Sequence, residues 1–270
     1  MSTVATLELF GQKIISRKER RVRETIAAQT GVVRMRRNRV KILALAFAFL
    51  IVLAGAGRHA VAQAGIAAYP AMAPLDQYLI PDEQSEIALA RSAAPSSISD
   101  GAEVMVLGRE GYKTAVKGTN GFLCIVERSW GQGTDEAEFW NPKMRAPHCF
   151  NAQGARSVAP IYLMKTKLVL EGKSKAEIAE AIKTGLDTKT LPLLEPGAMA
   201  YMMSKEQYLN DQGKSWRPHA MFFSPGDMTK AWAADDPNSP VMIGKDPQER
   251  LTILFVLANK WSDGTPAPSN

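Results

Sequence analysis

Beyond residue 64, any chemistry that needs a histidine must use one of two residues. His148 and His219 are the only imidazoles there, and imidazole is the side chain that most often transfers protons near neutral pH. Ser129, Ser204 and Ser224 are candidate nucleophiles, but their spacing selects none of them. Nucleophile-elbow, zinc-protease and phosphate-loop motifs do not occur in the sequence. A hydrolase that uses His148 or His219 is therefore the first alternative function.

Histidine and methionine together predict a second kind of chemistry, the binding of a soft metal ion. His219 and Met221 are two residues apart, so on a strand they share one face. Met199 and Met203 share a face of a proposed partner strand, and imidazole with thioethers suits copper(I). A periplasmic copper-binding protein is thus the second alternative, with His219, Met221 and Met203 as metal candidates. The competing interpretation is core filling, because methionine packs well against aromatic rings, here Phe222, Phe223 and Tyr201.

The two cysteines of the chain, Cys124 and Cys149, are most simply a disulfide. In the chain-entropy account, a crosslink that closes a loop of this length contributes on the order of 3 kcal/mol. The alternative is a reactive or metal-binding thiol, because an imidazolium at His148 would lower the pKa of the neighbouring Cys149. Paired carboxylates, for example Glu127 with Asp227, are a further route to acid–base chemistry.

Residues 129–150 form one loop by composition, rich in glycine, proline and aromatic side chains, and the loop ends beside the second cysteine. Long loops that are fixed to a sheet are common binding sites. Trp130, Trp140 and His148 are therefore the ligand-binding candidates, although the two tryptophans would also suit a core-capping role. The favoured function is a non-catalytic exported domain that binds a ligand or a protein partner, and no cofactor is expected.

The stretch 35–64 determines the expected compartment. It opens with basic residues, continues with an uninterrupted run of apolar and small residues at 42–56, and ends in small-x-small patterns. This order is typical of a secretory signal peptide, which predicts a secreted or periplasmic protein that begins near Gly65. The alternative is an uncleaved anchor in the inner membrane, because the basic extension 1–34 precedes the signal. Translation from Met35 would remove that extension.

The formal charge of +6 belongs to the N-terminal part of the chain. The sequence has 33 Lys/Arg and 27 Asp/Glu, of which 12 and 3 lie in residues 1–64, leaving 21 and 24. The remaining chain therefore has a formal charge of −3, which offers no electrostatic footprint for a phosphate backbone. We therefore expect no nucleic-acid partner, and contact with a membrane only through an uncleaved leader.

The pattern of elements predicts an α+β fold. Runs of β-prone residues at 103–108, 112–116 and 122–127 predict a three-stranded meander that begins a mainly antiparallel sheet. Amphipathic runs at 158–170 and 174–187 predict two consecutive helices packed on that sheet. The other expected elements are a helix at 82–91, paired strands at 197–204 and 219–224, a short helix at 225–232, and strands at 241–244 and 251–257.

Composition divides the chain into five segments. Residues 65–101 are rich in alanine, proline and serine, so we expect a linker that carries one short helix. The polar C-terminal tail contains two prolines and is expected to be disordered. The five segments are the basic extension 1–34, the signal peptide 35–64, the linker 65–101, the globular α+β domain 102–262 and the tail 263–270.

Four stretches of the sequence resemble a group of uncharacterised exported bacterial proteins. The stretches are Gly118–Cys124, His148–Phe150, Pro196–Ser204 and Pro218–Phe223. The resemblance extends over roughly residues 102–225, and it implies export and a single shared domain. The group has no known activity, so the resemblance assigns no functional residue.

Overall fold

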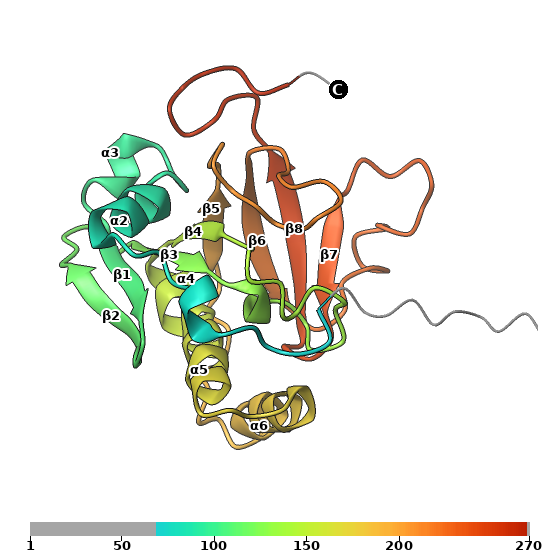
Figure 1. Ribbon diagram of the computed structural model, residues 1–270. Helices are drawn as coiled ribbons and strands as arrows, with labels where there is room; N and C mark the ends of the chain where they lie inside the picture. The colour runs from blue at the N-terminus through green and yellow to red at the C-terminus, as the bar shows by residue number, and fades with distance from the viewer. Residues whose placement is uncertain (1–68, 269–270) are drawn as a thin grey trace, which may run out of the picture. The chain divides into compact units, whose positions relative to one another are not determined.

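An eight-stranded mixed sheet forms the centre of the fold (Figure 1). The computed structural model describes residues 69–268, within the compact unit Gly65–Asn270. The strand order is β2-β1-β3-β4-β5-β6-β8-β7, and every neighbouring pair is antiparallel except β1 with β3. The strands are β1 (Glu103–Gly108), β2 (Gly111–Val116), β3 (Leu123–Glu127), β4 (Ala146–Phe150), β5 (Met199–Met202), β6 (His219–Pro225), β7 (Ile243–Asp246) and β8 (Leu251–Leu257).

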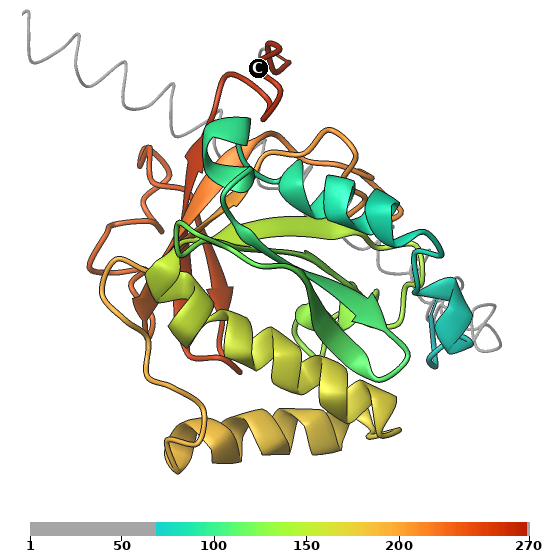
Figure 2. The ribbon, with the colours of Figure 1, turned by 90° about the vertical axis from the view of Figure 1, so that its left-hand side faces the viewer.

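Helices cover both faces of this sheet (Figure 2). Helix α2 packs against β1, β3 and β4 on one face, α4 and α5 cover the other face, and α6 packs on α5. The α+β class, the mainly antiparallel sheet and the two predicted consecutive helices are thereby confirmed. The helices are α2 (Glu83–Arg91), α3 (Ser96–Ser99), α4 (Ala152–Ser157), α5 (Ala159–Leu170) and α6 (Lys175–Asp187), with 3-10 turns η1 (Leu75–Gln77) and η2 (Ser129–Gly131).

Strands β3 and β4 lie between two hydrophobic cores. Every residue of both strands is buried, as expected for strands that are covered on both faces. Leu123 and Ile125 belong to the core beneath α4 and α5, whereas Cys124 and Val126 belong to the core beneath α2. Alternate residues of β3 therefore point into opposite cores.

The first three strands lie where the sequence predicts, but their pairing corrects the predicted meander. Strand β3 pairs with β1 in parallel, with Glu103 opposite Leu123, which leaves β2 at the sheet edge. The chain between β2 and β3 crosses the start of β1. A Cβ atom on Gly118 would lie 2.3 Å from the backbone nitrogen of Glu103, so this crossing requires glycine. The second hairpin of the predicted meander, between residues 112–116 and 122–127, does not form, because β2 and β3 are not neighbours.

Three further elements differ from their predicted form. Strand β4 occupies residues 146–150, which composition had assigned to a loop; because both of its faces are buried, it lacks the alternation that marks a half-exposed strand. Residues 225–232 contain turns instead of a helix. Strand β7 begins at Ile243, two residues later than predicted. The other predicted strands and helices agree with the structure to within a few residues.

Residues 69–101, expected as a linker, are fixed to the sheet through α2. The side chain of Asp82 caps this helix by accepting a hydrogen bond from the backbone N–H three residues later. Glu86 is 1% exposed and pairs with Arg128 at 2.9 Å. The Nε of Arg128 also donates to the carbonyl oxygen of Tyr78 at 2.6 Å. Removing one partner of such a buried pair costs about 3–5 kcal/mol, so this segment is part of the folded unit.

The predicted disulfide between Cys124 and Cys149 is confirmed. The two residues lie directly opposite each other on β3 and β4, and both are 0% exposed. No cysteine is free, and the chain has only these two. The alternative of a reactive or metal-binding thiol is therefore wrong.

Two predicted segments, the extension 1–34 and the signal peptide 35–64, lie outside the described residues. Within residues 69–268, no helix combines the length and the apolar composition that are needed to cross a bilayer. The described part of the predicted tail folds back on the residues that precede it, with an isolated β-bridge between Lys260 and Pro266.

Candidate functional site

A cleft of about 520 Å³ lies on the sheet face that α5 covers, at the end where β3 finishes and β4 begins. Strands β3, β4, β5, β6 and β8, helix α5 and two loops contribute to its wall. Its lining residues are Glu127, Gly131, Gln132, Glu136, Ala137, Glu138, Met144, Ala146, His148, Tyr162, Met202, Leu209, Asn210, Gln212, Met221 and Ile253. Apolar side chains and a few polar groups thus meet in one concave space, as in most small-molecule sites.

Strand register places histidine and methionine side by side in the cleft wall. Continuing the β4–β5 register by one position puts His148 opposite Met202, and Met202 pairs with His219 across β5 and β6. Directly opposed residues of antiparallel strands point to the same face. The three residues therefore form a row across three strands. Met221 lies on the same face, two residues after His219.

His148 is an uncharged imidazole with one free nitrogen. Its Nδ1 lies 3.2 Å from the carbonyl oxygen of Ala146 and 3.3 Å from Oε1 of Glu127. A carbonyl oxygen can only accept, so we assign the proton to Nδ1, which leaves the lone pair on Nε2. Burial, with a smaller contribution from His219, lowers the pKa of His148 to about 3. At neutral pH its contact with Glu127 is therefore not an ion pair.

Glu127 is a buried carboxyl group with one unused oxygen. Its Oε1 has no hydrogen-bond partner, and the residue is only 5% exposed. Burial and the nearby Glu249 raise the pKa of Glu127 well above its ordinary range, against the attraction of Lys165. A Cβ atom on Gly131 would lie 2.7 Å from Oε2 of Glu127, so the carboxyl group depends on this glycine for space. A ligand that satisfied Oε1 would remove the cost of an unpaired buried polar atom.

Lys165 of α5 connects one wall of the cleft to the turn between β7 and β8. Its Nζ donates to the carbonyl oxygens of Gly131 at 3.2 Å and Gln132 at 3.1 Å, and to the carboxylate of Glu249. The ammonium group has three N–H bonds, and these three acceptors use all of them. Lys165 is therefore not available as a hydrogen-bonding partner for Glu127.

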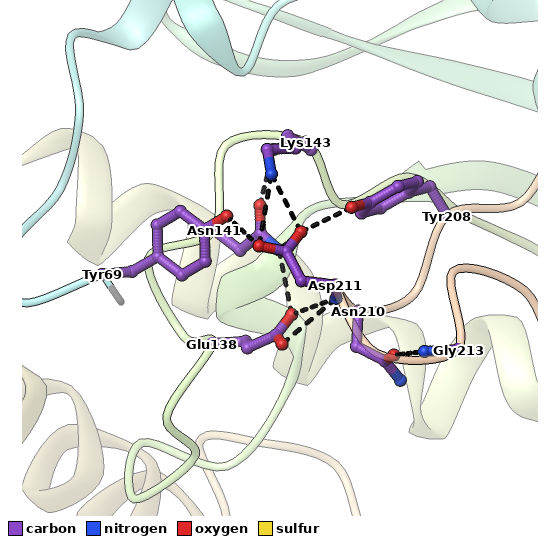
Figure 3. Close-up of polar contacts among 8 residues, drawn as sticks. All are labelled: Tyr69, Glu138, Asn141, Lys143, Tyr208, Asn210, Asp211 and Gly213. Carbon is purple, nitrogen blue, oxygen red and sulfur yellow. Dashed lines mark hydrogen bonds and ion pairs between the residues drawn. The ribbon is translucent and has the colours of Figure 1, made fainter. Parts of the chain in front are cut away.

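Figure 3 shows a cluster of hydrogen bonds around Asp211, the Asp211 cluster, which includes the cleft-lining residue Glu138. The hydroxyls of Tyr69 and Tyr208 donate to its carboxylate at 2.6 Å and 2.5 Å. The Nζ of Lys143 lies 3.0 Å and 3.2 Å from the two carboxylate oxygens. Hydrogen bonds from Tyr208, Tyr69 and Lys143 lower the pKa of Asp211, so the carboxylate stays ionised at neutral pH.

The Asp211 cluster joins two loops that line the cleft. The backbone N–H of Asp211 lies 3.1 Å from both carboxylate oxygens of Glu138, and the side-chain amide of Asn141 donates to the same carboxylate at 2.9 Å (Figure 3). Glu138 lies in the loop 132–145 and Asp211 in the loop 203–218. Because both loops contribute lining residues, these bonds fix the shape of that wall.

The cleft combines acidic and apolar groups without a basic one. Glu127, Glu136 and Glu138 contribute carboxyl groups, while Tyr162, Ile253 and three methionines contribute apolar surface. Among the described residues, no lysine or arginine lines the space. Electrostatic attraction in a poorly hydrated cleft exceeds that in bulk water. The arrangement therefore favours a small positively charged ligand over an anion.

The three predicted ligand-binding residues lie in two different environments. His148 lines the cleft. Trp130 and Trp140 are 1% and 7% exposed, and they pack in a separate core together with Tyr78 and Phe139. The tryptophans do not line the cleft. They are buried in a core, as the competing core-capping interpretation predicts. Of the three candidates, only His148 is positioned to meet a ligand in the cleft.

The predicted metal candidates are only partly brought together. His219 and Met221 share a face, as expected, but the residue opposite His219 is Met202, whereas Met203 follows the end of β5. The ring of His219 packs 4.5 Å from that of Trp216, and His219 does not line the cleft. Within residues 69–268, no group of three or more histidine, cysteine, aspartate or glutamate side chains is arranged to hold a metal ion.

The predicted hydrolase groups are also separated. Ser129, Ser204 and Ser224 do not line the cleft, and the hydroxyl of Ser204 hydrogen-bonds another serine hydroxyl at 2.6 Å. Glu127 lines the cleft, whereas Asp227 lines a different pocket and lies 3.5 Å from a lysine ammonium group. Of these two carboxyl groups, only that of Glu127 therefore lies next to a histidine.

Several residues of the site were not predicted from sequence. Met202 could have been found by aligning the two strands at 197–204 and 219–224, because antiparallel register fixes which residues share a face. Glu138 and Asp211 carry no such signal, since they lie in loops whose path the sequence does not determine. No protein-family model, curated protein or solved structure matches this chain.

Proposed function

We propose that this chain is a non-catalytic binding protein whose cleft takes a small, positively charged ligand. The observation that carries the proposal is the lining, which has three carboxyl groups and a neutral imidazole but no lysine or arginine from the described residues. One carboxyl oxygen, Oε1 of Glu127, is buried without a partner. A cation beside this oxygen gains an attraction that water screens only weakly.

Binding of a cation is coupled to the ionisation of Glu127. In the free protein this group is uncharged over an extended pH range, because burial raises its pKa. A bound cation stabilises the carboxylate form, so binding releases a proton to solvent. The affinity for a cation therefore rises with pH until Glu127 ionises in the free protein. A neutral ligand would show no such dependence.

The apolar part of the cleft limits the size and character of the ligand. A volume of about 520 Å³ lies within the range of small-molecule sites. Tyr162, Met144 and Ile253 offer apolar contacts next to the carboxyl groups. An organic ammonium ion with a compact apolar body, or a metal ion with soft ligands, matches this mixture.

We infer a location outside the cytoplasm, either periplasmic or secreted. Two features support it: the disulfide formed by the only two cysteines of the chain, and the stretch 35–64 with the order of parts of a signal peptide. An uncleaved leader would instead anchor the protein to the inner membrane. The binding domain would then still lie in the oxidising periplasm.

Calorimetric titration of the full chain with phenethylammonium tests the proposed function. Phenylacetate is the matched control ligand, because it joins a similar apolar body to the opposite charge. We expect only the ammonium ion to bind, with an affinity that increases as the pH rises above the ordinary range of a glutamate carboxyl group. Binding of phenylacetate with equal affinity would contradict the proposal.

Matched variants locate the binding. Glu127→Gln removes the group that ionises when a cation binds, and Gly131→Ala displaces Oε2 of the same carboxyl group, so both should weaken binding. Glu110→Gln changes an exposed glutamate outside the cleft, and Gly108→Ala adds a Cβ that makes only an ordinary contact at 3.6 Å. Both controls should bind like the wild type. Unchanged affinity in Glu127→Gln and Gly131→Ala would show that binding occurs elsewhere.

One contact favours a second function, hydrolysis. Oε1 of Glu127 lies 3.3 Å from Nδ1 of His148, and an imidazole next to a carboxyl group can act as a general base. No serine, threonine or cysteine among the described residues lines the cleft, so water would be the nucleophile. Hydrolysis of p-nitrophenyl acetate by the full chain should then be lost in His148→Gln and retained in His219→Gln. A rate equal to that in buffer alone would contradict this function.

A further inference from the structure

We propose that the positively charged ligand is a copper(I) ion, bound by Nε2 of His148 and by the Sδ atoms of Met202 and Met221. The inference rests on the proposed function, because it names the cation that the same cleft takes. Imidazole and thioether groups are soft ligands that favour monovalent copper over harder ions such as magnesium and calcium.

The three ligands come from neighbouring positions on one face of β4, β5 and β6. Met202 lies opposite His148 in the β4–β5 register, and Met221 lies opposite Ala200, two residues before Met202. Directly opposed Cβ atoms are about 5 Å apart and diagonal neighbours about 7–8 Å, within reach of long side chains. All three side chains line the same cleft. Strands therefore position every ligand, which gives the site a rigid frame.

His148 is arranged in the way that metal-binding histidines usually are. Its Nδ1–H hydrogen-bonds the carbonyl oxygen of Ala146 at 3.2 Å. Such a contact fixes the ring and directs the lone pair of the other nitrogen to a metal. The ring also stacks on Phe150 and Tyr162, with centroid distances of 5.6 Å and 6.3 Å. The imidazole is thus held without using Nε2.

The other nearby methionines are distinguishable from the two proposed ligands. Met144 lines the cleft, but its sulfur accepts a hydrogen bond from the side-chain amide of Gln132 at 2.7 Å. Met199 and Met203 are buried and do not line the cleft. Met202 and Met221 also pack in the core beneath α4 and α5, but unlike Met199 and Met203 they border the open space of the cleft.

A carboxyl group lies next to the proposed copper ligand His148. The imidazole of His148 and the two thioethers are neutral, so the metal brings one uncompensated positive charge. The carboxyl group of Glu127 lies behind His148 and has a buried oxygen without a partner. The described residues offer no cluster of the ligands that zinc prefers, so zinc is expected to bind weakly.

Competition for copper(I) against the chelator bicinchoninate tests the assignment. The full chain is used with its disulfide intact and with ascorbate as the reductant, so that no thiol contributes to binding. We expect one copper(I) ion per chain. Met202→Leu, Met221→Leu and His148→Gln should each weaken binding by more than about tenfold, because each loses a direct ligand. Met203→Leu is the matched control and should bind copper like the wild type.

Folding of the variants is checked by their thermal midpoints, and leucine is a near-isosteric replacement that a core tolerates well. Absence of copper binding, an equal loss in Met203→Leu, or equally tight zinc binding would overturn the copper assignment. If phenethylammonium still binds in a manner that depends on Glu127, the proposed function stands without copper. If neither copper(I) nor phenethylammonium binds the full chain, the proposed function fails as well.

Discussion

At the scale of single residues, one physical cause gives Glu127 and His148 opposite pKa shifts. Burial disfavours the charged form of any group, so it raises the pKa of the carboxyl group and lowers that of the imidazole. Burial therefore favours the neutral form of both groups, which lie only 3.3 Å apart. A cation bound beside Glu127 would favour its carboxylate form instead.

The pKa of His148 predicts a loss of stability in acid. Its value is about 3 in the folded protein and 6.5 without the protein environment. Between these values the unfolded chain binds a proton that the folded protein does not, so the free energy of unfolding falls as the pH falls. The full loss is on the order of 5 kcal/mol. Urea unfolding of wild type and His148→Gln between pH 7 and pH 4 should give a flatter pH dependence for the variant.

Two other groups also contribute to the pH dependence of the unfolding free energy in that experiment. Burial also lowers the pKa of His219, so His148→Gln should retain part of the acid sensitivity. Glu127 acts in the opposite direction: its raised pKa means that stability is lost as the pH rises above the unfolded value. A variant curve parallel to that of the wild type would show that His148 is not held neutral.

The sequence predicted some of these residues for identifiable reasons. His148 was a candidate because histidines are rare in this part of the chain, and it does line the cleft. The sequence analysis selected Met203 and not Met202, because a shift of one residue in strand register changes which methionine lies opposite His219. The burial of Trp130 and Trp140 depends partly on contacts with residues more than thirty positions away in the sequence. The composition of the loop gives no information about such contacts.

At the scale of elements, local sequence patterns predicted where strands and helices lie better than they predicted which strands pair. The bounds of β1, β2 and β3 follow from β-prone runs and glycine turns, yet the parallel pairing of β1 with β3 depends on a crossing at Gly118. Strand β4 was missed because a strand buried on both faces has no alternation and here includes a proline. The capping box of α6, by contrast, is a local signal, and it forms at Ser174 and Glu177.

The loop 203–218 should depend on the Asp211 cluster for its order. Asp211→Ala removes the acceptor of Tyr69, Tyr208 and Lys143 while leaving the backbone bond to Glu138. We expect trypsin to cleave this loop several-fold faster, because its local opening no longer breaks those bonds. Limited proteolysis followed by mass spectrometry measures the rate at each site.

The control for this prediction is Asp227→Ala. The carboxylate of Asp227 accepts bonds from Thr229 within its own turn and lies away from the cleft. Cleavage within 203–218 should stay at the wild-type rate in this control. Equal acceleration in both variants would mean that a general loss of stability, and not the Asp211 cluster, controls the loop.

At the scale of the whole molecule, the disulfide lies at the centre of the two-core architecture. Cys124 and Cys149 join the two strands that carry Glu127 and His148, and five registered residue pairs hold those strands together. The ladder alone can therefore maintain the strand register in the folded state. The crosslink contributes mainly by restricting the unfolded chain.

Removal of the disulfide should lower stability without removing the binding site. For a sequence separation of 25, the double variant Cys124→Ala, Cys149→Ala should lose about 3 kcal/mol of unfolding free energy. Phenethylammonium binding should persist under conditions where the variant remains folded, because the β3–β4 ladder still positions Glu127 beside His148. Urea unfolding and calorimetric titration at the same pH measure the two effects separately. Unchanged stability would contradict the entropic role, and lost binding in a folded variant would mean that the crosslink itself aligns the cleft.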